Sequence, residues 1–432
     1  MTRTLEELYG HDTAGLSAVS KAINEELKKI HKNYGEVQVP SPLIAQEKAQ
    51  QWFDIALTLK NALFRCVLNT RNLSELLEQQ GITGNFRQWI LDNQHAFKFK
   101  NSHNSLRPDF IFDGQDLKLL EFNVSSALGG LGVLNRYISL QQAHELDAIP
   151  DNINLRYIDV DDVWYPIVKP NRSDSHQLTI DLVIDPDDDI EAGFYRPDFH
   201  KRMRDHGFDV VAAKIAELTI TESGLMYNNR RVDYLYSNFP YDIFYENQIA
   251  LDFYSQLSPL IDQSLLKLIG HPIASVLETK SNIALLSNGF FDAMLTSDEI
   301  DLIQKHIPNT DFLRNFGNSH LIEFQDDYIL KPVVGSCGGE VVIGKTCTDE
   351  VWVNKIESAR QQSVPYIVQR YVEQAKCNDP QLILPDHDFC CFGIYIFDDQ
   401  FGGLLYRGTP SSDTGVVNAT SGALFSPIAL FE

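Results

Sequence analysis

Apolar residues recur every three and four positions over much of the first hundred residues, which is the spacing of an amphipathic helix. The segments with this spacing are 16–35, 45–70 and 86–97. The run VQVPSPLIA carries two prolines and the run GITGN carries two glycines, and both interrupt the helical pattern. The pattern therefore predicts a helical region over residues 1–100 that packs as a cover on the rest of the chain.

From about residue 170 the pattern alternates between short strand-like runs and helical runs. Strands are predicted at 177–185, at 208–213 and on both sides of an Asn-Asn turn within 224–239, and helices are predicted at 195–207 and 247–270. Strands that alternate with helices are typical of an α/β lobe. No G-x-G-x-x-G run opens any of these helices, so this lobe lacks the dinucleotide-binding fingerprint.

The run DDYILKPVVGSCGGEVVIGK predicts a strand, a glycine-rich turn and a second strand. Lys331 ends the first strand. Gly335, Gly338 and Gly339 let the backbone approach a phosphate chain and present its N–H groups. The run is not a Walker A loop, because it lacks the G-K-[ST] ending and leads into a strand. An ordinary β-hairpin explains these glycines equally well.

A buried strand is predicted next, at 366–369, and it continues into Tyr371 and Val372. The end of such a strand can offer backbone groups to an adenine ring, with Gln369 close by. Two antiparallel strands with alternating faces are predicted after it, at 388–397 and 401–410. These patterns favour a nucleotide-binding region in this part of the chain.

The run RPDFIFDGQDLKLLEFNVSSALGGLG, residues 107–132, concentrates acidic, amide and flexible residues on one predicted hairpin. Strand 109–112 turns at Gly114 into strand 117–124. The alternation of the second strand places its polar residues on one face and leaves its apolar residues free to pack. The serine- and glycine-rich run that follows has the composition of a substrate loop.

Two carboxylates and one amide converge if these strands pair antiparallel. Asp109 then approaches Glu121 and Asn123. Oxygen ligands of this kind suit Mg²⁺, which keeps several waters and often takes ligands from substrate phosphates. The alternative interpretation is a solvated hairpin in which Asn123 caps a turn.

Composition narrows the possible partners. With 432 residues, of which 44% are hydrophobic, the chain can bury a large core. A formal net charge of −23 argues against broad contact with a nucleic-acid backbone, which needs clustered Lys and Arg. Any bound phosphate is expected to be small and bridged by metal. The start of the chain lacks a signal-peptide core and no apolar run approaches about 18 residues, so we expect a cytoplasmic protein without a membrane partner.

The six cysteines follow no regular framework, as expected for a reducing compartment. A zinc site is conceivable near the C-terminus, but the spacing matches no common zinc pattern. Its residues would be Cys377, His387, Cys390 and Cys391.

The order of these features resembles one family. The run ILKP, a glycine-rich turn, the strand end VQRYV and a terminal segment containing Asn418 are similar to those of the ATP-grasp ligases. The acidic hairpin precedes Lys280 and Lys331, which is the order of the circularly permuted group that includes the synthetase domain of glutathionylspermidine synthase. The family pattern Arg-x-Asp, eleven residues, Glu-x-Asn matches without a gap. The matching residues are Arg107, Asp109, Glu121 and Asn123.

This resemblance implies a circularly permuted ATP-grasp fold with an N-terminal helical region and a Rossmann-like α/β lobe. The implied parts are a helical cover at 1–100, the hairpin and substrate loop at 101–170, the α/β lobe at 171–275 and the nucleotide-binding lobes at 276–432. The implied activity is that of an ADP-forming carboxylate–amine ligase that uses ATP and Mg²⁺ to join a small polar acid and an amine through an acyl phosphate.

The resemblance also implies residue roles. Asp109, Glu121 and Asn123 would bind Mg²⁺, and Arg107 would stabilise the acyl phosphate. The residues expected to contact ATP are Lys280, Lys331, Gly335, Ser336, Gly338, Gly339, Gln369, Tyr371 and Val372. Ser125 and Ser126 would recognise the substrate. The run from Val124 to Ala127 replaces the Ala-Asp-Thr-Pro run of glutathionylspermidine synthase, so the substrate is expected to differ.

Two other classes remain open at this point. A protein of this fold could bind ATP as a regulator without turnover. Alternatively, Asp109, Glu121 and a histidine such as His103 could hold iron or manganese for redox or hydrolytic chemistry. Arg407 and Asn418 could contact either nucleotide or substrate. An ADP-release assay with pools of amino acids and amines separates the three classes.

Overall fold

Helices and several sheets make up the described chain, so the mixed α/β class predicted from the sequence is confirmed. The structure is a computed structural model. It describes residues 13–30, 36–125, 128, 134–135, 137–140, 155–169, 177–183, 196–237, 247–335, 340–374, 379–409, 415–417 and 422–432.

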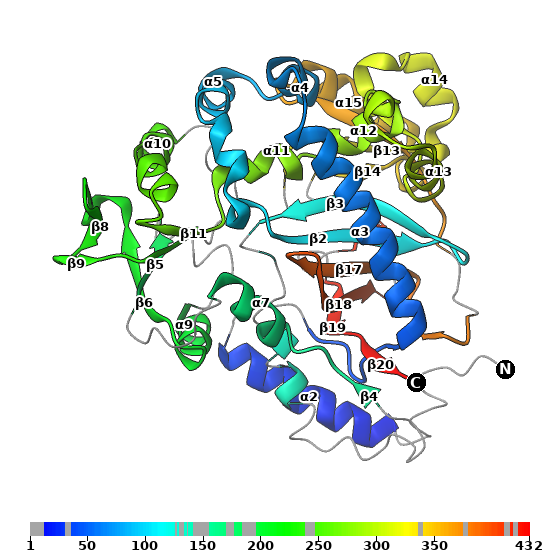
Figure 1. Ribbon diagram of the computed structural model, residues 1–432. Coiled ribbons are helices and arrows are strands. Elements are labelled where there is room, and N and C mark those ends of the chain that lie inside the picture. The colour runs from blue at the N-terminus through cyan, green and yellow to red at the C-terminus, as the bar shows by residue number, and fades with distance from the viewer. Residues whose placement is uncertain are drawn as a thin grey trace.

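An antiparallel sheet of five strands, in the order β19-β18-β17-β2-β3, lies in the middle of the molecule (Figure 1). Its strands are β2 (Ser105–Phe112), β3 (Leu117–Val124), β17 (Phe389–Phe397), β18 (Gln400–Thr409) and β19 (Leu424–Pro427). Helix α3 (Gln46–Leu68) packs against this sheet. The Trp52 ring of α3 lies 5.0 Å from the ring of Phe392 and 5.9 Å from the ring of Phe112. The buried positions of α3 follow the three- and four-residue spacing, which is why this helix can cover a flat sheet face.

A second antiparallel sheet, in the order β12-β15-β13-β14, belongs to the C-terminal half of the chain. Its strands are β12 (Thr310–Phe312), β13 (Tyr328–Pro332), β14 (Val342–Ile343) and β15 (Tyr366–Arg370). Helices α14 (Asn318–Glu323) and α15 (Asp349–Gln361) pack with it, and Trp352 of α15 donates its indole N–H to the Leu321 carbonyl at 2.8 Å. The predicted pairing of the strands on either side of the glycine-rich turn is confirmed.

A parallel sheet, in the order β11-β10-β5-β6, forms a third layer on the other side of the central sheet (Figure 1). Its strands are β5 (Leu178–Val183), β6 (Asp209–Lys214), β10 (Tyr234–Tyr236) and β11 (Lys267–Ile269), with helices α9 (Arg196–Asp205) and α10 (Gln248–Asp262). All residues of β5 are buried, as expected for a strand with both faces covered. A small ribbon of β7 (Leu218–Thr221), β8 (Gly224–Tyr227) and β9 (Arg230–Arg231) projects from this layer.

A fourth sheet, in the order β16-β1-β20-β4, brings together distant parts of the chain. Its strands are β1 (Leu43–Ala45), β4 (Leu155–Arg156), β16 (Leu382–Ile383) and β20 (Ala429–Phe431). The remaining α-helices of the described chain are α2 (Thr13–Ile30), α4 (Leu73–Gln80), α5 (Gly84–Asp92), α7 (Val160–Val168), α11 (Ser275–Glu278), α12 (Ser281–Ser287) and α13 (Ser297–His306).

Two element predictions are wrong in part. The helix predicted over 247–270 ends at Asp262, and Lys267–Ile269 forms β11, because this apolar run pairs in parallel with β10. The break between the first two predicted helices contains a strand, β1, which is too short to show a period in the sequence. Both strands depend on partners far away in the chain.

Other expectations fall partly or wholly outside the described residues. These include Ser126, Ser336, Gly338, Gly339, Cys377 and Asn418. The sequence also predicts a helix over 134–145, and of this range residues 134–135 and 137–140 are described and are helical. Among the helices that the structure describes, none has the length and apolar content needed to cross a bilayer. The division into four parts stays a prediction.

Candidate functional site

The acidic hairpin forms as predicted, with β2 and β3 paired antiparallel. Asp109 lies opposite Glu121, and Arg107 lies opposite Asn123. A bulge in the register after Asp109 leaves Leu120 without an opposite residue. The bulge shifts the alternation of β3, so Glu121 and Asn123 are only partly buried, whereas Phe122 and Val124 are fully buried. The hairpin therefore carries its polar residues on one face despite the irregular pattern.

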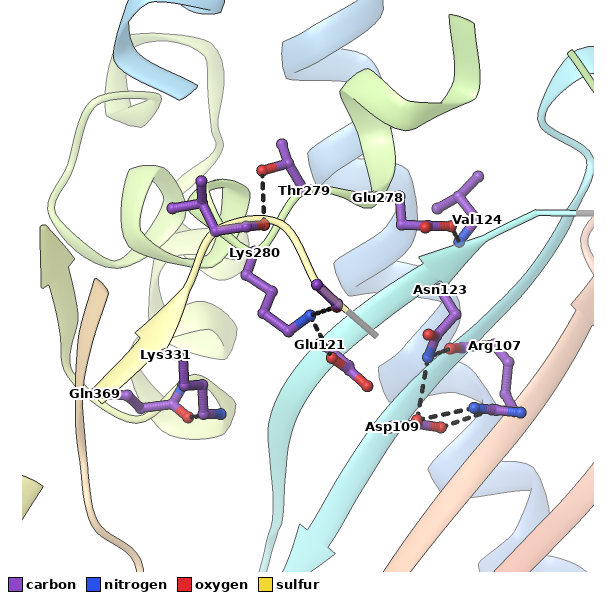
Figure 2. Close-up of polar contacts among 12 residues, drawn as sticks. Arg107, Asp109, Glu121, Asn123, Val124, Glu278, Thr279, Lys280, Lys331 and Gln369 are labelled. Carbon is purple, nitrogen blue, oxygen red and sulfur yellow. Dashed lines mark hydrogen bonds and ion pairs between the residues drawn. The ribbon is translucent and has the colours of Figure 1, made fainter. Parts of the chain in front are cut away.

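Two guanidinium groups hold the buried carboxylate of Asp109, and Figure 2 shows one of them, that of Arg107. Arg107 donates from Nε to Oδ1 at 2.7 Å and from Nη2 to Oδ2 at 3.0 Å. Arg407 of β18 lies 2.7 Å from Oδ2, and Asn123 Nδ2 donates to the same oxygen at 3.0 Å. Burial opposes ionisation, but the two guanidinium groups outweigh it and hold the pKa of Asp109 below its usual value. Asp109 is therefore an ionised carboxylate whose two oxygens are both in use.

A glycine in β17 makes room for this cluster. Gly393 lies opposite Asp109 in the sheet, and a Cβ at this position would be 2.5 Å from Arg107 Cδ and 2.9 Å from Asp109 Oδ1. Its neighbours on the same face are Cys391 and Tyr395. Arg407 Nη2 donates to Cys391 Sγ at 3.1 Å, and the Tyr395 ring lies 5.8 Å from the guanidinium carbon of Arg107. Both arginines therefore pack against residues of strand β17.

Lys280 joins the hairpin to the second sheet. Its Nζ lies 3.1 Å from Glu121 Oε2 and donates to the Gly335 carbonyl at 2.8 Å (Figure 2). Burial opposes charge on both partners, but their attraction prevails. It raises the pKa of Lys280 above its usual value and lowers the pKa of Glu121 below its own. Lys280 and Glu121 therefore form an ion pair in this structure.

Lys331 points toward the same region from β13. Its Nζ donates to Gln369 Oε1 of β15 at 2.6 Å, and Gln369 Nε2 donates to Thr310 Oγ1 at 3.1 Å. Burial lowers the pKa of Lys331 to about 8, Glu121 partly counteracts this, and the charge of Lys280 adds to the lowering. Both ends of the Gln369 amide are engaged by protein groups, so Gln369 orients Lys331. Its expected contact with nucleotide stays a prediction.

The site carries more positive than negative charge. Its cationic side chains are Arg107, Arg407, Lys280 and Lys331, and its carboxylates are Asp109, Glu121 and Glu278. Four cations against three anions leave one excess positive charge in a chain whose formal net charge is −23. A partly buried excess of this sign attracts small anions such as phosphates and carboxylates.

The oxygens of the hairpin meet the needs of Mg²⁺ in part. Among the described residues, Glu121 gives one oxygen to Lys280 and Asn123 bonds through its amide nitrogen, so one oxygen of each has no partner within that part of the chain. Asp109 has both oxygens bound by guanidinium groups. One carboxylate and one amide oxygen fit a Mg²⁺ ion that takes its other ligands from water and phosphate. The assignment of Asp109 as a ligand stays a prediction.

The other candidate residues are only partly placed. Gly335 has φ of +144°, a conformation that favours glycine, and its carbonyl accepts from Lys280. The Tyr371 ring lies 5.4 Å from Lys345 Nζ, and its backbone N–H donates to the Asp327 carbonyl at 2.6 Å. Ser125 and Val372 are partly buried. Their roles toward substrate and nucleotide stay predictions.

The metalloenzyme alternative with His103 is wrong. His103 Nδ1 lies 2.6 Å from Ser102 Oγ, and its ring contacts Phe64 of α3. It lines a cavity of about 270 Å³ between α3 and the β17–β18 turn, and neither Asp109 nor Glu121 lines this cavity. Within the described ranges, no group of three or more His, Cys, Asp or Glu residues could hold a metal ion.

The zinc interpretation also fails for its described members. Cys390 Sγ lies 3.2 Å from the Tyr406 hydroxyl, whereas Cys391 Sγ accepts from Arg407. Adjacent strand residues point to opposite faces, so these two thiols cannot share an ion. Burial raises the pKa of Cys391 to about 12, which keeps it protonated. The described cysteines Cys66, Cys347, Cys390 and Cys391 form no disulfide bonds.

Three important contacts were not predicted from the sequence. Arg407 was expected to contact either nucleotide or substrate and not Asp109, and Gly393 and Glu278 were not considered. Glu278 Oε2 accepts from the Val124 backbone N–H at 3.0 Å, which fixes the end of β3 (Figure 2). The alternation of strand 401–410 put Arg407 on one face, but only the strand order shows that this face contains Asp109.

Comparison with known proteins shows a shared fold. No protein-family model matches the chain, and no curated protein matches its sequence. A glutathione synthetase-like effector from Globodera pallida, solved in its apo form, is similar in structure with a TM-score of 0.54 and 14% identity, over 98% of this chain and 98% of that chain. This likeness covers nearly both chains and concerns the fold alone.

Two other solved structures are more distant. A putative γ-glutamylcysteine synthetase from Methylobacillus flagellatus aligns with a TM-score of 0.43 and 14% identity, over 86% of this chain and 88% of that chain. A D-cycloserine synthetase aligns with a TM-score of 0.32 and 13% identity, over 57% of this chain and 73% of that chain. Neither likeness is strong enough to support an argument about this chain.

Proposed function

We propose that this protein is an ADP-forming carboxylate–amine ligase of the circularly permuted ATP-grasp type. The observation that carries the proposal is the meeting of Lys280, Lys331 and Glu121 between two antiparallel sheets, beside the Arg107–Asp109–Arg407 cluster. Such a site combines positive charge for phosphates with oxygen ligands for Mg²⁺. The fold shared with a glutathione synthetase-like effector supports the same class.

The chemistry needs a carboxylate oxygen to become a leaving group. The γ-phosphoryl group of ATP is transferred to that oxygen, and the amine then displaces phosphate from the acyl phosphate to form an amide. Mg²⁺, when bound through Glu121 and Asn123, would offset charge on the phosphates. Lys280 and Lys331 would bind ATP oxygens as point charges, and this positioning supplies much of the catalysis.

The two arginines have a different role. Arg107 and Arg407 bring charged, planar donors to one buried point, and Asp109 fixes their orientation. Guanidinium groups suit carboxylate and acyl phosphate oxygens because their N–H groups match those oxygens in pairs. We therefore place the reacting carboxylate near these arginines. The backbone of Tyr371 and Val372 would line the adenine pocket, and Ser125 and Ser126 would contact a small polar substrate.

The test is product analysis. The protein, supplied with ATP, Mg²⁺ and pools of amino acids, small peptides and amines, should release ADP and inorganic phosphate and form an amide detectable by mass spectrometry. Lys331→Met should abolish this release. Lys305→Met is the matched control, because Lys305 pairs with Asp116 at the far end of the same hairpin, and it should keep the activity.

Other outcomes identify other classes. Release of AMP and pyrophosphate would point to adenylation and overturn the acyl-phosphate mechanism. Tight ATP binding without turnover against every pool would indicate the regulatory alternative. Calorimetry that detects no ATP binding would exclude both the ligase and the ATP-binding regulator.

A further inference from the structure

One side chain connects the two sheets that form the site. Lys280 Nζ contacts the Glu121 carboxylate of β3 at 3.1 Å and the Gly335 carbonyl, just after β13, at 2.8 Å. The side chain of Lys280 is 14% exposed and that of Glu121 is 28% exposed. Lys280 therefore occupies a partly buried position between the metal-binding face of the hairpin and the strand that carries Lys331.

Hydrogen bonds join the segment around Lys280 to β3 and to the residues just after β13. Its N–H donates to the Val333 carbonyl at 3.0 Å, and Thr279 Oγ1 donates to the same carbonyl at 3.2 Å (Figure 2). On the other side, Glu278 accepts from the Val124 N–H. The Cα of Lys280 is thus fixed, and any change of partner must come from rotation of its flexible side chain.

The proposed function gives Lys280 and Glu121 partners other than each other. Lys280 would bind an ATP oxygen, and Glu121 would bind Mg²⁺. A lysine paired with the carboxylate cancels the charge that attracts a divalent cation, and the excess positive charge of the site adds repulsion. A nucleotide reverses both effects, because its phosphates attract Lys280 away from Glu121 and supply further ligands to the metal.

We propose that Lys280 acts as a latch on Glu121, so that the metal ion binds tightly only together with the nucleotide. This inference rests on the proposed function and specifies how its site is regulated. The latch weakens metal binding at the nucleotide-free site and releases Glu121 when phosphate oxygens bind the ammonium group.

The experiment measures Mn²⁺ binding by electron paramagnetic resonance, with Mn²⁺ as a probe of the Mg²⁺ site. The wild-type protein should bind Mn²⁺ weakly alone and much more tightly with ADP present. Lys280→Met should bind Mn²⁺ without nucleotide at least about tenfold more tightly than wild type, a change of about 1.4 kcal/mol. Lys280→Arg keeps the charge and should resemble wild type.

Control variants test whether the Mn²⁺ binding gained in Lys280→Met depends on Glu121. Adding Glu121→Gln to Lys280→Met should abolish the gained Mn²⁺ binding. Lys305→Met, which breaks a lysine–carboxylate pair elsewhere on the hairpin, should leave Mn²⁺ binding unchanged. Lys280→Gln serves as a second removal of the charge if the methionine variant does not fold.

Wild-type protein that binds Mn²⁺ without nucleotide as tightly as Lys280→Met overturns the latch, even if the ligase reaction is found. Mn²⁺ that fails to bind under any condition overturns both the latch and the metal assignment. The identity of the reaction products tests the proposed function separately. A protein that shows the expected nucleotide-dependent Mn²⁺ binding but forms no amide would keep the latch and lose the ligase.

Discussion

At the scale of single residues, the buried charges of this site depend on their partners. Asp109 is the common acceptor of Arg107, Arg407 and Asn123, and it is almost fully buried. A carboxylate in that position stabilises both guanidinium groups and fixes the direction of their N–H groups. Its first role is therefore to position the arginines, whatever further contact a metal ion makes.

Removal of the Asp109 carboxylate should destabilise the folded protein. Asp109→Ala leaves the buried guanidinium of Arg107 and the partly buried one of Arg407 without their main partner, and we expect a loss of about 3–5 kcal/mol in the free energy of unfolding. Chemical denaturation measures it. The control is Asp116→Ala, which breaks a partly exposed pair with Lys305 and should cost at most about 1 kcal/mol. Equal losses in the two variants would contradict the central role of Asp109.

Lys331 should make nucleotide affinity depend on pH. Burial lowers its pKa to about 8, so its positive charge is present below pH 8 and is lost as pH rises above it. Nucleotide binding favours the charged form, so affinity should fall by up to about tenfold per pH unit above pH 8. Calorimetry from pH 7 to pH 9.5 measures this decline.

Two variants test the assignment of this pH dependence. Lys331→Arg remains charged across the range and should show a flat profile. Lys331→Met should bind weakly at every pH. A wild-type profile that Lys331→Arg reproduces would place the titrating group elsewhere.

At the scale of elements, strand β17 has no room for a side chain at the position that faces the Arg107 side chain. Gly393 lies in regular strand pairing with β2. It is needed for space, because a Cβ would overlap the Arg107 side chain. The bulge in β3 has a related function, since it turns Glu121 and Asn123 toward the site while Phe122 and Val124 remain in the core. Gly393 makes room for Arg107 on β17, and the bulge at Leu120 orients the polar residues of β3.

The space at Gly393 can be tested directly. Gly393→Ala should displace Arg107 and destabilise the fold by about 1–3 kcal/mol, as expected for overpacking. It should also lower the proposed ligase activity. Gly317→Ala is the control, because a Cβ added at Gly317 would meet no atom within 4 Å and the φ of this residue is −78°. Thermal unfolding compares the two, and a neutral Gly393→Ala would show that Arg107 can move freely.

At the scale of the whole molecule, a buried histidine joins the helical cover to the parallel sheet. His271 stacks on Trp89 of α5 and packs edge-on against Tyr254 of α10. Its Nδ1 accepts from the Ile273 backbone N–H at 3.1 Å. Burial, with smaller contributions from His95 and His103, lowers the pKa of His271 to about 3. The folded protein therefore keeps this ring neutral over most of the acidic range.

Acid should weaken the fold through this histidine. Between pH 6.5 and pH 3 the unfolded chain binds a proton at His271 that the folded chain does not bind. Its stabilising contribution is thus complete above pH 6.5 and is lost as pH falls, by up to about 1.4 kcal/mol per pH unit. His271→Asn keeps an acceptor for Ile273 and cannot be protonated. The difference in melting temperature between pH 7 and pH 5 should shrink in this variant, and an unchanged difference would exclude His271 as the cause.

Local patterns in the sequence determined much of the architecture. Periodicity and turn residues act over a few positions. They predict helix α3, the alternation of strands and helices after residue 170, and the acidic hairpin. Gly114 illustrates this, since its φ of +100° is the conformation that only glycine adopts readily in the predicted turn. The turn by itself would pair Asp109 with Leu120, and the bulge at Leu120 is what brings Glu121 opposite Asp109.

The partners of the site residues were decided only by the tertiary structure. Arg407 reaches Asp109 because β17 separates β18 from β2, and Lys331 meets Gln369 because β13 pairs with β15. Short strands such as β1 and β11 exist only through neighbours distant in the chain. Charge types and their local spacing are written in the sequence, but which cation neutralises which carboxylate depends on strand order and burial, and no local pattern encodes these.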